Sequence, residues 1–229
     1  MSNPKHTRIY FVYKSGDQYQ IRDMHEAYVA ENTDFDVSAV FIKSSLGNVR
    51  VSPNIVESIF NQAEVEDYTY ATGGRTVDLL DAPLLSYHIR DRNVREFNNS
   101  DDGDLTAQQL DDLVDMVRTG YEATEQRPVA VFVETPEMRG FADVVGHSAI
   151  TAESVAHDEY EYLGWLTVFT PSMVEQYGRE TLQSAPACRI EEFDDGSILL
   201  ICNDRPFDHE RIWRDVADHI GLPLIRDLT

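Results

Sequence analysis

The apolar residues of this chain come in short runs that predict β-strands, and these runs alternate with segments of helical periodicity. Strands are predicted at residues 8–14, 37–43, 84–89, 128–134 and 163–169, which are dense in β-branched, aromatic or leucine residues. No run of about 18 apolar residues is present, so no membrane-spanning segment is expected. A chain of 229 residues with this pattern is expected to form one large domain or two small ones.

Helical segments are indicated by apolar residues spaced three or four positions apart and by capping residues at their starts. Helices are predicted at residues 18–31, from Ser52 onward, at 106–125, and after the Thr-Pro pairs at 135–136 and 170–171. The last helix is expected to begin at Asp208 and to end at Gly221. The stretches 64–81 and 151–159 are polar and have no clear periodicity.

A β-hairpin is predicted near the end of the chain, where residues 187–193 and 197–202 flank Asp194-Asp195-Gly196. A hairpin combined with β-α-β order favours an α+β fold with mixed or antiparallel sheets and helices packed on one face. The polar segment 98–104 divides an N-terminal α/β half (1–100) from a C-terminal α+β half (101–229), and one continuous domain is the alternative. Segments 130–138 and 166–173 share a strand, a Thr-Pro pair and a methionine. The two halves of the chain are therefore either structurally related or similar here by coincidence.

The charge of the chain is unusual, because 41 acidic residues face 19 basic ones for a formal net charge of −22. Only Lys5, Lys14 and Lys43 are lysines, and the other sixteen basic residues are arginines. At molar salt the Debye length is about 3 Å, so repulsion among carboxylates is screened, whereas at low salt it opposes compaction. This composition is typical of a halophilic protein with an acidic surface. An acidic surface suited to a basic partner predicts the same charge.

The charge of the chain bears on its expected partners, and its N-terminal sequence and cysteine content bear on its expected location. Nucleic acid is not expected as a partner, since phosphate contacts need clustered Lys and Arg. The densest basic cluster, Arg90, Arg92 and Arg95, is interleaved with Asp91 and Glu96. The polar start of the chain has no apolar signal-peptide region, and two cysteines do not make a secreted disulfide framework. A cytoplasmic location without membrane contact is therefore expected.

Histidines supply only weak candidates for a metal site. His147, His157 and Asp158 flank a polar loop at 146–161, for which a solvated loop is the plainer interpretation. No complete phosphate-binding loop and no nucleophile motif are present, so no cofactor is expected and the catalytic residues, if any, are unknown.

The two cysteines form the other candidate site. If Asp195 is the centre of the hairpin, residues whose numbers sum to 390 lie opposite each other, and Cys188 and Cys202 do so. Their side chains would then be about 5 Å apart on one face. A cross-strand disulfide or redox pair is one interpretation. The favoured interpretation is that both cysteines are reduced thiols in a cytosolic protein.

A pattern across the second half carries a family resemblance. A helix and an apolar strand are followed by Gly164-Trp165-Leu166-Thr167-Val168-Phe169 and a proline-started helix. Next come a strand and then the turn and apolar strand of residues 196–201. They are followed by Arg205-Pro206-Phe207-Asp208, which opens an amphipathic helix. Residues 106–228 thus resemble the immunity proteins of polymorphic toxin systems, in particular the α+β proteins that accompany nuclease toxins. The resemblance implies a protein that binds and blocks a toxin without catalysis. It assigns no functional residue, because these stretches are structural in such proteins.

The sequence therefore favours a salt-adapted, non-enzymatic binding protein of immunity type with a basic protein partner. The first alternative is an enzyme with an unrecognised active site near the 146–161 loop. The second is a homo-oligomeric protein, plausibly a homodimer, in which the expected exposed aromatics Tyr160 and Tyr162 line the interface.

Overall fold

The computed structural model of the chain describes residues 7–13, 18–29, 37–44, 47–61, 65–72, 75–80, 85–91, 107–134, 138, 148–204 and 211–228. The strands in these ranges form one ten-stranded sheet in the order β3-β2-β4-β5-β6-β1-β7-β8-β10-β9, in which every pair of neighbours is antiparallel. The strands are β1 (Thr7–Tyr13), β2 (Val37–Ser44), β3 (Gly47–Val51), β4 (Val65–Thr72), β5 (Arg75–Leu80), β6 (Leu85–Asp91), β7 (Ala130–Glu134), β8 (Leu166–Phe169), β9 (Arg189–Glu192) and β10 (Ile198–Ile201).

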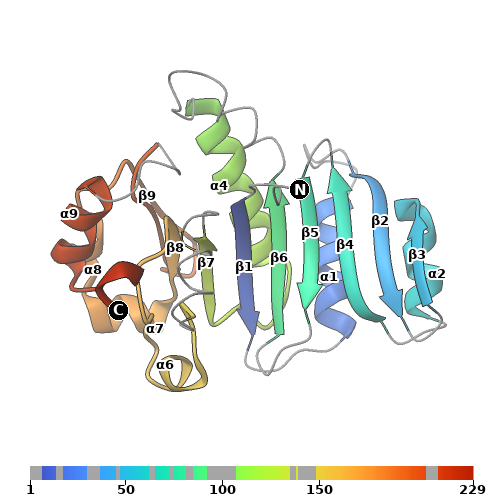
Figure 1. Ribbon diagram of the computed structural model, residues 1–229, viewed down its shortest axis with the longest axis horizontal. Helices are drawn as coiled ribbons and strands as arrows, with labels where there is room; N and C mark the ends of the chain where they lie inside the picture. Colours follow the sequence, from blue (N-terminus) through green and yellow to red (C-terminus); the bar gives the residue numbers. More distant parts are fainter. Residues whose placement is uncertain are drawn as a thin grey trace.

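Strand β1 joins the two halves of the chain. It pairs with β6 on one side, with Tyr10 opposite His88, and with β7 on the other, with Tyr10 opposite Phe132. The sheet is therefore continuous across the proposed division at residue 100, from β3 at one end of Figure 1 to β9 at the other.

Three helices, α1 (Gln18–Val29), α2 (Val56–Phe60) and α4 (Ala107–Glu122), lie behind the sheet in Figure 1. Phe11 of β1 points toward this layer, because a Cβ atom placed on Gly120 of α4 would lie 2.5 Å from its ring. Tyr28 of α1 donates a hydrogen bond to the Met116 carbonyl of α4 (2.9 Å), so α1 and α4 are also joined directly. The 3-10 helix η1 (Pro53–Ile55) precedes α2, and the helix expected from Ser52 is thus confirmed in a short form.

The opposite face of the sheet carries helices at the β8–β9 end. Side chains alternate between faces along a strand, so Tyr10, Phe132 and Phe169 face away from α4. They begin a row of aromatic contacts that passes from Tyr10 through Phe132, Tyr160 and Phe169 to Tyr177 of α7 (Pro171–Tyr177), with ring centroids 4.7–6.2 Å apart. Helix α8 (Arg179–Gln183) follows α7 and packs against α9 (Arg211–Ile220).

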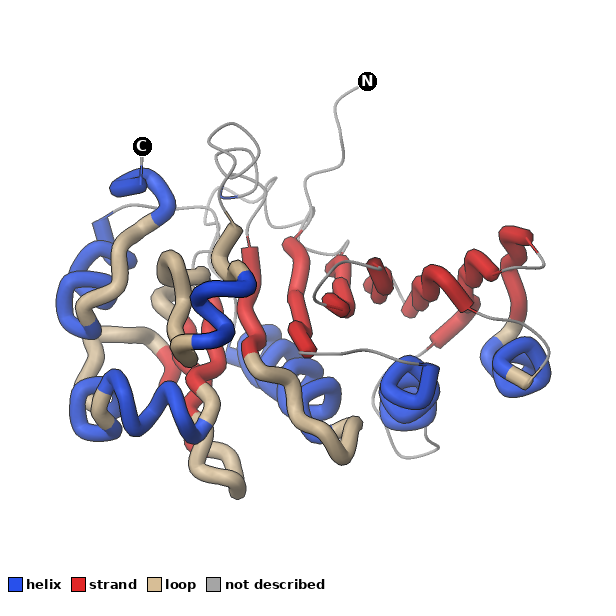
Figure 2. The backbone as a smooth tube through the Cα atoms, turned by 90° about the horizontal axis from the view of Figure 1, so that it is seen from below, coloured by secondary structure: helices blue, strands red, loops and turns tan. Residues whose placement is uncertain are grey.

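The fold is α+β, as the sequence predicts, but its helices lie on both faces of the sheet at this end (Figure 2). The expected packing on one face holds for α1, α2 and α4, whereas α7 and α8 cover the other face. Helices cover both faces at this end because all four residues of β8 and all four of β10 are buried. A strand that is apolar on both faces needs cover on both.

Tyr160 and Tyr162 are buried, with 3% and 0% of their surfaces exposed, so the expectation that they are exposed is wrong. The Tyr160 hydroxyl lies between two strands, where it donates to the Val168 carbonyl (2.7 Å) and accepts from the Val131 N–H (3.1 Å). A tyrosine can be buried in this way because its hydroxyl is hydrogen-bonded. These two side chains cannot line an interface between copies.

The remaining elements are short. Helix α6 (Ala152–Ala156) occupies the polar stretch after residue 151 and begins with a capping box, in which Thr151 and Ser154 exchange hydrogen bonds. A 3-10 helix, η2 (Ile225–Leu228), ends the described chain. The helix predicted after residues 135–136 lies outside the described residues except for Met138, which is helical, and the cap at Asp208 lies outside them as well. No helix among the described residues is long and apolar enough to cross a membrane.

Candidate functional site

The β9–β10 hairpin forms one end of the sheet and is the most strongly charged element that the structure describes in full. Its turn is set by Gly196, which has φ 87°, a conformation that glycine adopts without strain. The Gly196 N–H donates to the Phe193 carbonyl and the Phe193 N–H donates to the Ser197 carbonyl, both at 2.9 Å. Residues opposite each other, such as Glu192 and Ile198, have numbers that sum to 390, which is the register expected from the sequence.

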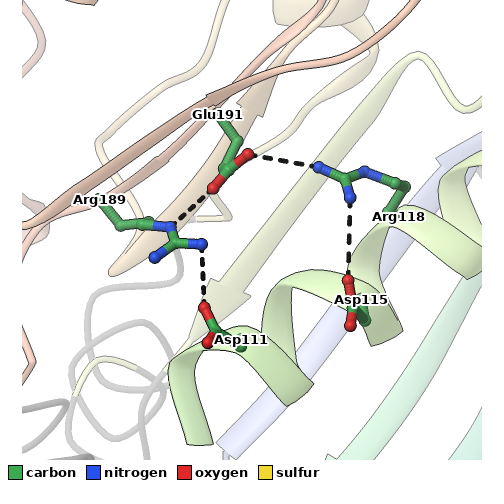
Figure 3. A network of polar contacts seen from close by, with 5 residues as sticks. All are labelled: Asp111, Asp115, Arg118, Arg189 and Glu191. Carbon is green, nitrogen blue, oxygen red and sulfur yellow. Dashed lines mark hydrogen bonds and ion pairs between the residues drawn. The ribbon is translucent and has the colours of Figure 1, made fainter. Parts of the chain in front are cut away.

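Arg189 and Glu191 lie opposite Ile201 and Leu199, on the face of the sheet that carries α4. Both side chains enter a network with that helix (Figure 3). Arg189 pairs with Asp111 (2.9 Å) and with Glu191 (2.7 Å). Arg118 of α4 pairs with Glu191 (3.4 Å) and with Asp115 (3.8 Å). Two arginines thus join three carboxylates, and the edge strand is tied to a helix that otherwise packs under β1.

Glu192 lies on the other face of the hairpin, where it is held by α8. Its carboxylate pairs with Arg179 and accepts a hydrogen bond from the Gln183 side chain (2.9 Å). The end strand is therefore held by charged contacts on both faces. Exposed ion pairs of this kind each contribute about 0–1 kcal/mol to stability, so we regard them as fixing position more than as supplying stability.

The hairpin turn is held by Tyr121 of α4. The buried Tyr121 hydroxyl contacts the Asp195 carboxylate (2.8 Å) and the Ser197 hydroxyl (2.7 Å). Burial acts to raise the pKa of Asp195, but hydrogen bonds from the Ser197 N–H and Tyr121, with the charge of Arg127, outweigh it and lower that pKa. Ser197 is fully buried, so this Tyr-Asp-Ser group is a structural support and not an accessible nucleophile.

Negative charge exceeds positive charge around this end of the sheet. Among the residues that the structure describes, seven carboxylates lie on or beside the hairpin and four guanidinium groups interact with them, an excess of three negative charges. The carboxylates are those of Asp111, Asp115, Glu191, Glu192, Asp194, Asp195 and Asp204, and the arginines are Arg118, Arg127, Arg179 and Arg189. We call β9 with these residues the β9 edge.

Cys188 and Cys202 lie one step beyond the last paired residues of the hairpin, Arg189 and Ile201. Both are free thiols, with Cys188 exposed and Cys202 buried. The Cys188 N–H donates to the Ile201 carbonyl (3.0 Å), and the Cys202 thiol donates to the Gly164 carbonyl (3.4 Å). Although the Cys188 side chain is exposed, the protein on one side of its sulfur partly desolvates the thiolate, and this desolvation, with the charge of Asp204, raises the pKa of Cys188 to about 11. Full burial raises the pKa of Cys202 as well. A raised pKa lowers the thiolate fraction of both cysteines at neutral pH, and the thiolate is the nucleophilic form.

We expect Cys188 to react with a thiol-disulfide reagent at pH 8 about tenfold more slowly than an unhindered cysteine. Its thiolate fraction is lower by about two pKa units, and the greater nucleophilicity of a more basic thiolate offsets about half of that. The rate should rise with pH toward 11, and Cys202 should react only in denaturant. Stopped-flow labelling of the protein, with Cys188→Ser as the control, measures both rates. Fewer than two thiols in freshly purified, denatured protein would contradict the free-thiol assignment.

The 146–161 loop is described from residue 148 onward, and His147 lies outside the described residues. His157 is exposed and its Nδ1 contacts the Glu153 carbonyl one turn earlier in the chain (2.8 Å). Asp158 follows with φ 54°, a left-handed conformation that aspartate tolerates. Within the described part of the chain, no three histidine, cysteine or acidic side chains are grouped so as to hold a metal ion. Thr151 and Ser154 cap helix α6, and the Thr151 hydroxyl also donates to the Glu161 carboxylate (2.7 Å).

The sequence did not indicate the contacts that define the β9 edge. Arg118 and Asp111 are on α4, while Arg189 and Glu191 follow about 70 residues later, so their pairing depends on the tertiary fold and not on a local pattern. The available signal is that Asp111 and Asp115 lie on the side of the 106–125 helix opposite its apolar stripe of Leu110, Leu113, Val114 and Val117, which matches their partial or full exposure. Comparison of the chain with protein-family models, with curated proteins and with solved structures finds no match.

Proposed function

We propose that this chain is a salt-adapted binding protein of immunity type, which binds and blocks a basic protein partner and catalyses no reaction. The observation that carries the proposal is that the arginines form ion pairs within the chain. In the described part of the chain, five arginines form ion pairs with the chain's own carboxylates: Arg22, Arg118, Arg179, Arg189 and Arg214. The positive charge of these five arginines is thereby neutralised, and carboxylates without an ion pair remain among the described residues.

These surplus carboxylates are exposed. Glu122, Glu125, Glu175, Asp215 and Asp218 are exposed and have no ion pair with another described residue. A surface of this kind speeds encounter with a basic partner and rejects acidic ones. The location in the cytoplasm and the identity of the partner as a toxin form part of the same proposal, and they rest on the resemblance of residues 106–228 to immunity proteins.

The test is capture of a partner by the full-length protein in 1 M KCl, followed by identification of what binds. The proposal expects one predominant protein of high isoelectric point, bound at a defined stoichiometry and inhibited when bound. An unrelated protein of similar negative charge serves as the control bait. Capture of nothing, or of the same mixture on both baits, would contradict the proposal.

Salt adaptation has its own expected result. We expect the melting temperature to rise by about 5–10 °C between 0.1 M and 2 M KCl, because the Debye length falls from about 10 Å to below 3 Å and repulsion among carboxylates is screened. Such a rise corresponds to roughly 2–3 kcal/mol for a chain of this size. Thermal unfolding followed by circular dichroism measures it. An equal melting temperature at the two salt concentrations would refute salt adaptation.

A matched variant separates charge screening from general effects of salt. Glu122, Glu125, Glu175, Asp215 and Asp218 can be changed together to the corresponding amides, since all are exposed and lack ion pairs among the described residues. The amide variant should respond less to KCl than the parent protein. An undiminished response would assign the effect to preferential exclusion of salt from the protein surface.

A further inference from the structure

Strand β9 has a ladder partner on one side only among the described strands, which leaves a backbone edge at this end of the sheet. In an antiparallel ladder, alternate residues direct both their N–H and C=O groups toward the neighbouring strand. The Phe193 N–H bonds to Ser197 of the β10 side, so Arg189 and Glu191 share that direction. The N–H and C=O groups of Ile190 and Glu192 therefore point outward from the sheet.

The edge is held in a fixed position before any partner arrives. Glu191 and Arg189 tie β9 to α4, Glu192 ties it to α8, and Tyr121 ties the turn to the same α4 helix. Arg118 also lies over the Phe193 ring at the end of the strand, 5.2 Å from its centroid. A strand already held in the extended conformation loses little conformational entropy when another strand adds to it.

From this edge and its charge we infer that β9 accepts an extended, basic segment of the partner protein as an eleventh strand of the sheet. The inference rests on the proposed binding function and adds to it the place and mode of binding. Main-chain hydrogen bonds to Ile190 and Glu192 would supply affinity, as in other complexes formed by strand addition. Alternate side chains of the added strand would lie over the two faces, beside Glu191 on one and Glu192 on the other.

The charge of the β9 edge favours a basic segment as the added strand. Seven carboxylates against four guanidinium groups at the β9 edge favour lysine or arginine on the added strand. At low KCl concentration a second copy of this chain is disfavoured, because each copy has a formal net charge of −22 and the repulsion is not screened. Charged residues on edge strands also prevent self-association, and here the same residues would admit a segment of opposite charge.

The experiment uses the full chain and a capped peptide of alternating arginine and valine, six residues long, at the lowest KCl concentration that keeps the protein folded. Binding is followed by fluorescence anisotropy, and its place by hydrogen exchange of the Ile190 and Glu192 amides. We expect saturable binding, slowed exchange at both amides, and affinity at least tenfold weaker for Ile190→Pro, which removes one outward N–H. The same peptide with alternate backbone amides methylated should also bind at least tenfold more weakly.

The controls separate strand addition from simple charge attraction. A glutamate-valine peptide should not bind, and Glu57→Gln on α2, distant in sequence and in the sheet, should not change the affinity. Equal binding of the methylated peptide would overturn the inference without any variant of the protein, so the result stands even where Ile190→Pro fails to fold. Absence of binding, or a dimer of the free chain that Ile190→Pro disrupts, would overturn it as well.

Failure here is distinguishable from failure of the proposed function. If capture in molar KCl yields a basic partner that the parent protein and Ile190→Pro retain equally, the binding function stands and strand addition at β9 is refuted. If the partner is lost selectively from Ile190→Pro while Glu57→Gln retains it, both are supported.

Discussion

Replacing Gly120 with alanine is expected to destabilise the protein by about 2–3 kcal/mol, although alanine is the better helix former. In an isolated helix the change would stabilise by about 1 kcal/mol. Here a Cβ atom at position 120 would lie 2.3 Å from the Tyr28 hydroxyl oxygen and 2.5 Å from the Phe11 Cζ atom. Overpacking of this kind costs about 1–3 kcal/mol and sometimes more, and displacement of Tyr28 would also break its hydrogen bond to the Met116 carbonyl.

Urea unfolding in concentrated KCl measures the effect of Gly120→Ala, with Thr119→Ala on the same helix as the control. Tyr28→Phe removes the closest clashing atom, so Gly120→Ala should be less destabilising in that background. A double-mutant cycle tests this directly. Strict additivity of the two changes, or an unchanged stability for Gly120→Ala, would show that α1 and α4 do not meet as closely as the structure has them.

Asn203 is the second position where a single change should have a large effect. Its side-chain oxygen accepts a hydrogen bond from the indole N–H of Trp165 and another from that of Trp213, each at 2.9 Å. All three side chains are buried. The amide thereby joins the strand end at β8 to helix α9. The Trp165 indole N–H also donates to the main-chain carbonyl of Asn203 (2.9 Å), which an alanine keeps. We expect Asn203→Ala to cost about 2–4 kcal/mol, because it removes the side-chain acceptor of Trp213 and one of the two acceptors of Trp165, and leaves a cavity.

The two indoles are the only tryptophans of the chain, so their fluorescence reports on this site directly. Asn203→Ala should lower the unfolding midpoint and change the native emission spectrum, whereas Asn54→Ala at the exposed start of η1 should do neither. In a Trp213→Phe background, the loss from Asn203→Ala should be smaller, since one of the two donors is already gone. An equal loss in both backgrounds would show that Trp213 does not depend on Asn203.

Elements with a strong local pattern were predictable from the sequence. Helix α4 shows an apolar stripe, so it was predicted near its observed bounds. The β9–β10 hairpin shows two short strands around a glycine turn, so it was predicted with the observed register. Strands β4 and β5 were missed because they lie in a polar stretch, Val65–Leu80, with no alternation of apolar residues strong enough to identify them. Their pairing is determined by neighbours in the sheet, since strand propensity depends on context.

The order of the sheet and the β9 edge depend on contacts distant in sequence. Nothing local to residues 7–13 indicates that β1 lies between β6 and β7. The burial of Tyr160 likewise follows from acceptors on β7 and β8, which no pattern near residue 160 reveals. The charge of the candidate site was predictable as a total, but the separation into internally paired arginines and surplus carboxylates was not.

The place of β1 in the sheet has a consequence for how the protein is made. This strand is synthesised before both of its partners, β6 and β7, and the second of these ends at Glu134. Contacts between segments so far apart slow folding, and an unpaired strand edge exposed during synthesis can recruit other chains. Strand β1 thus keeps an unpaired edge until β7 has been made. We expect truncated chains that end before β7 to aggregate, whatever the quality of their local hairpins.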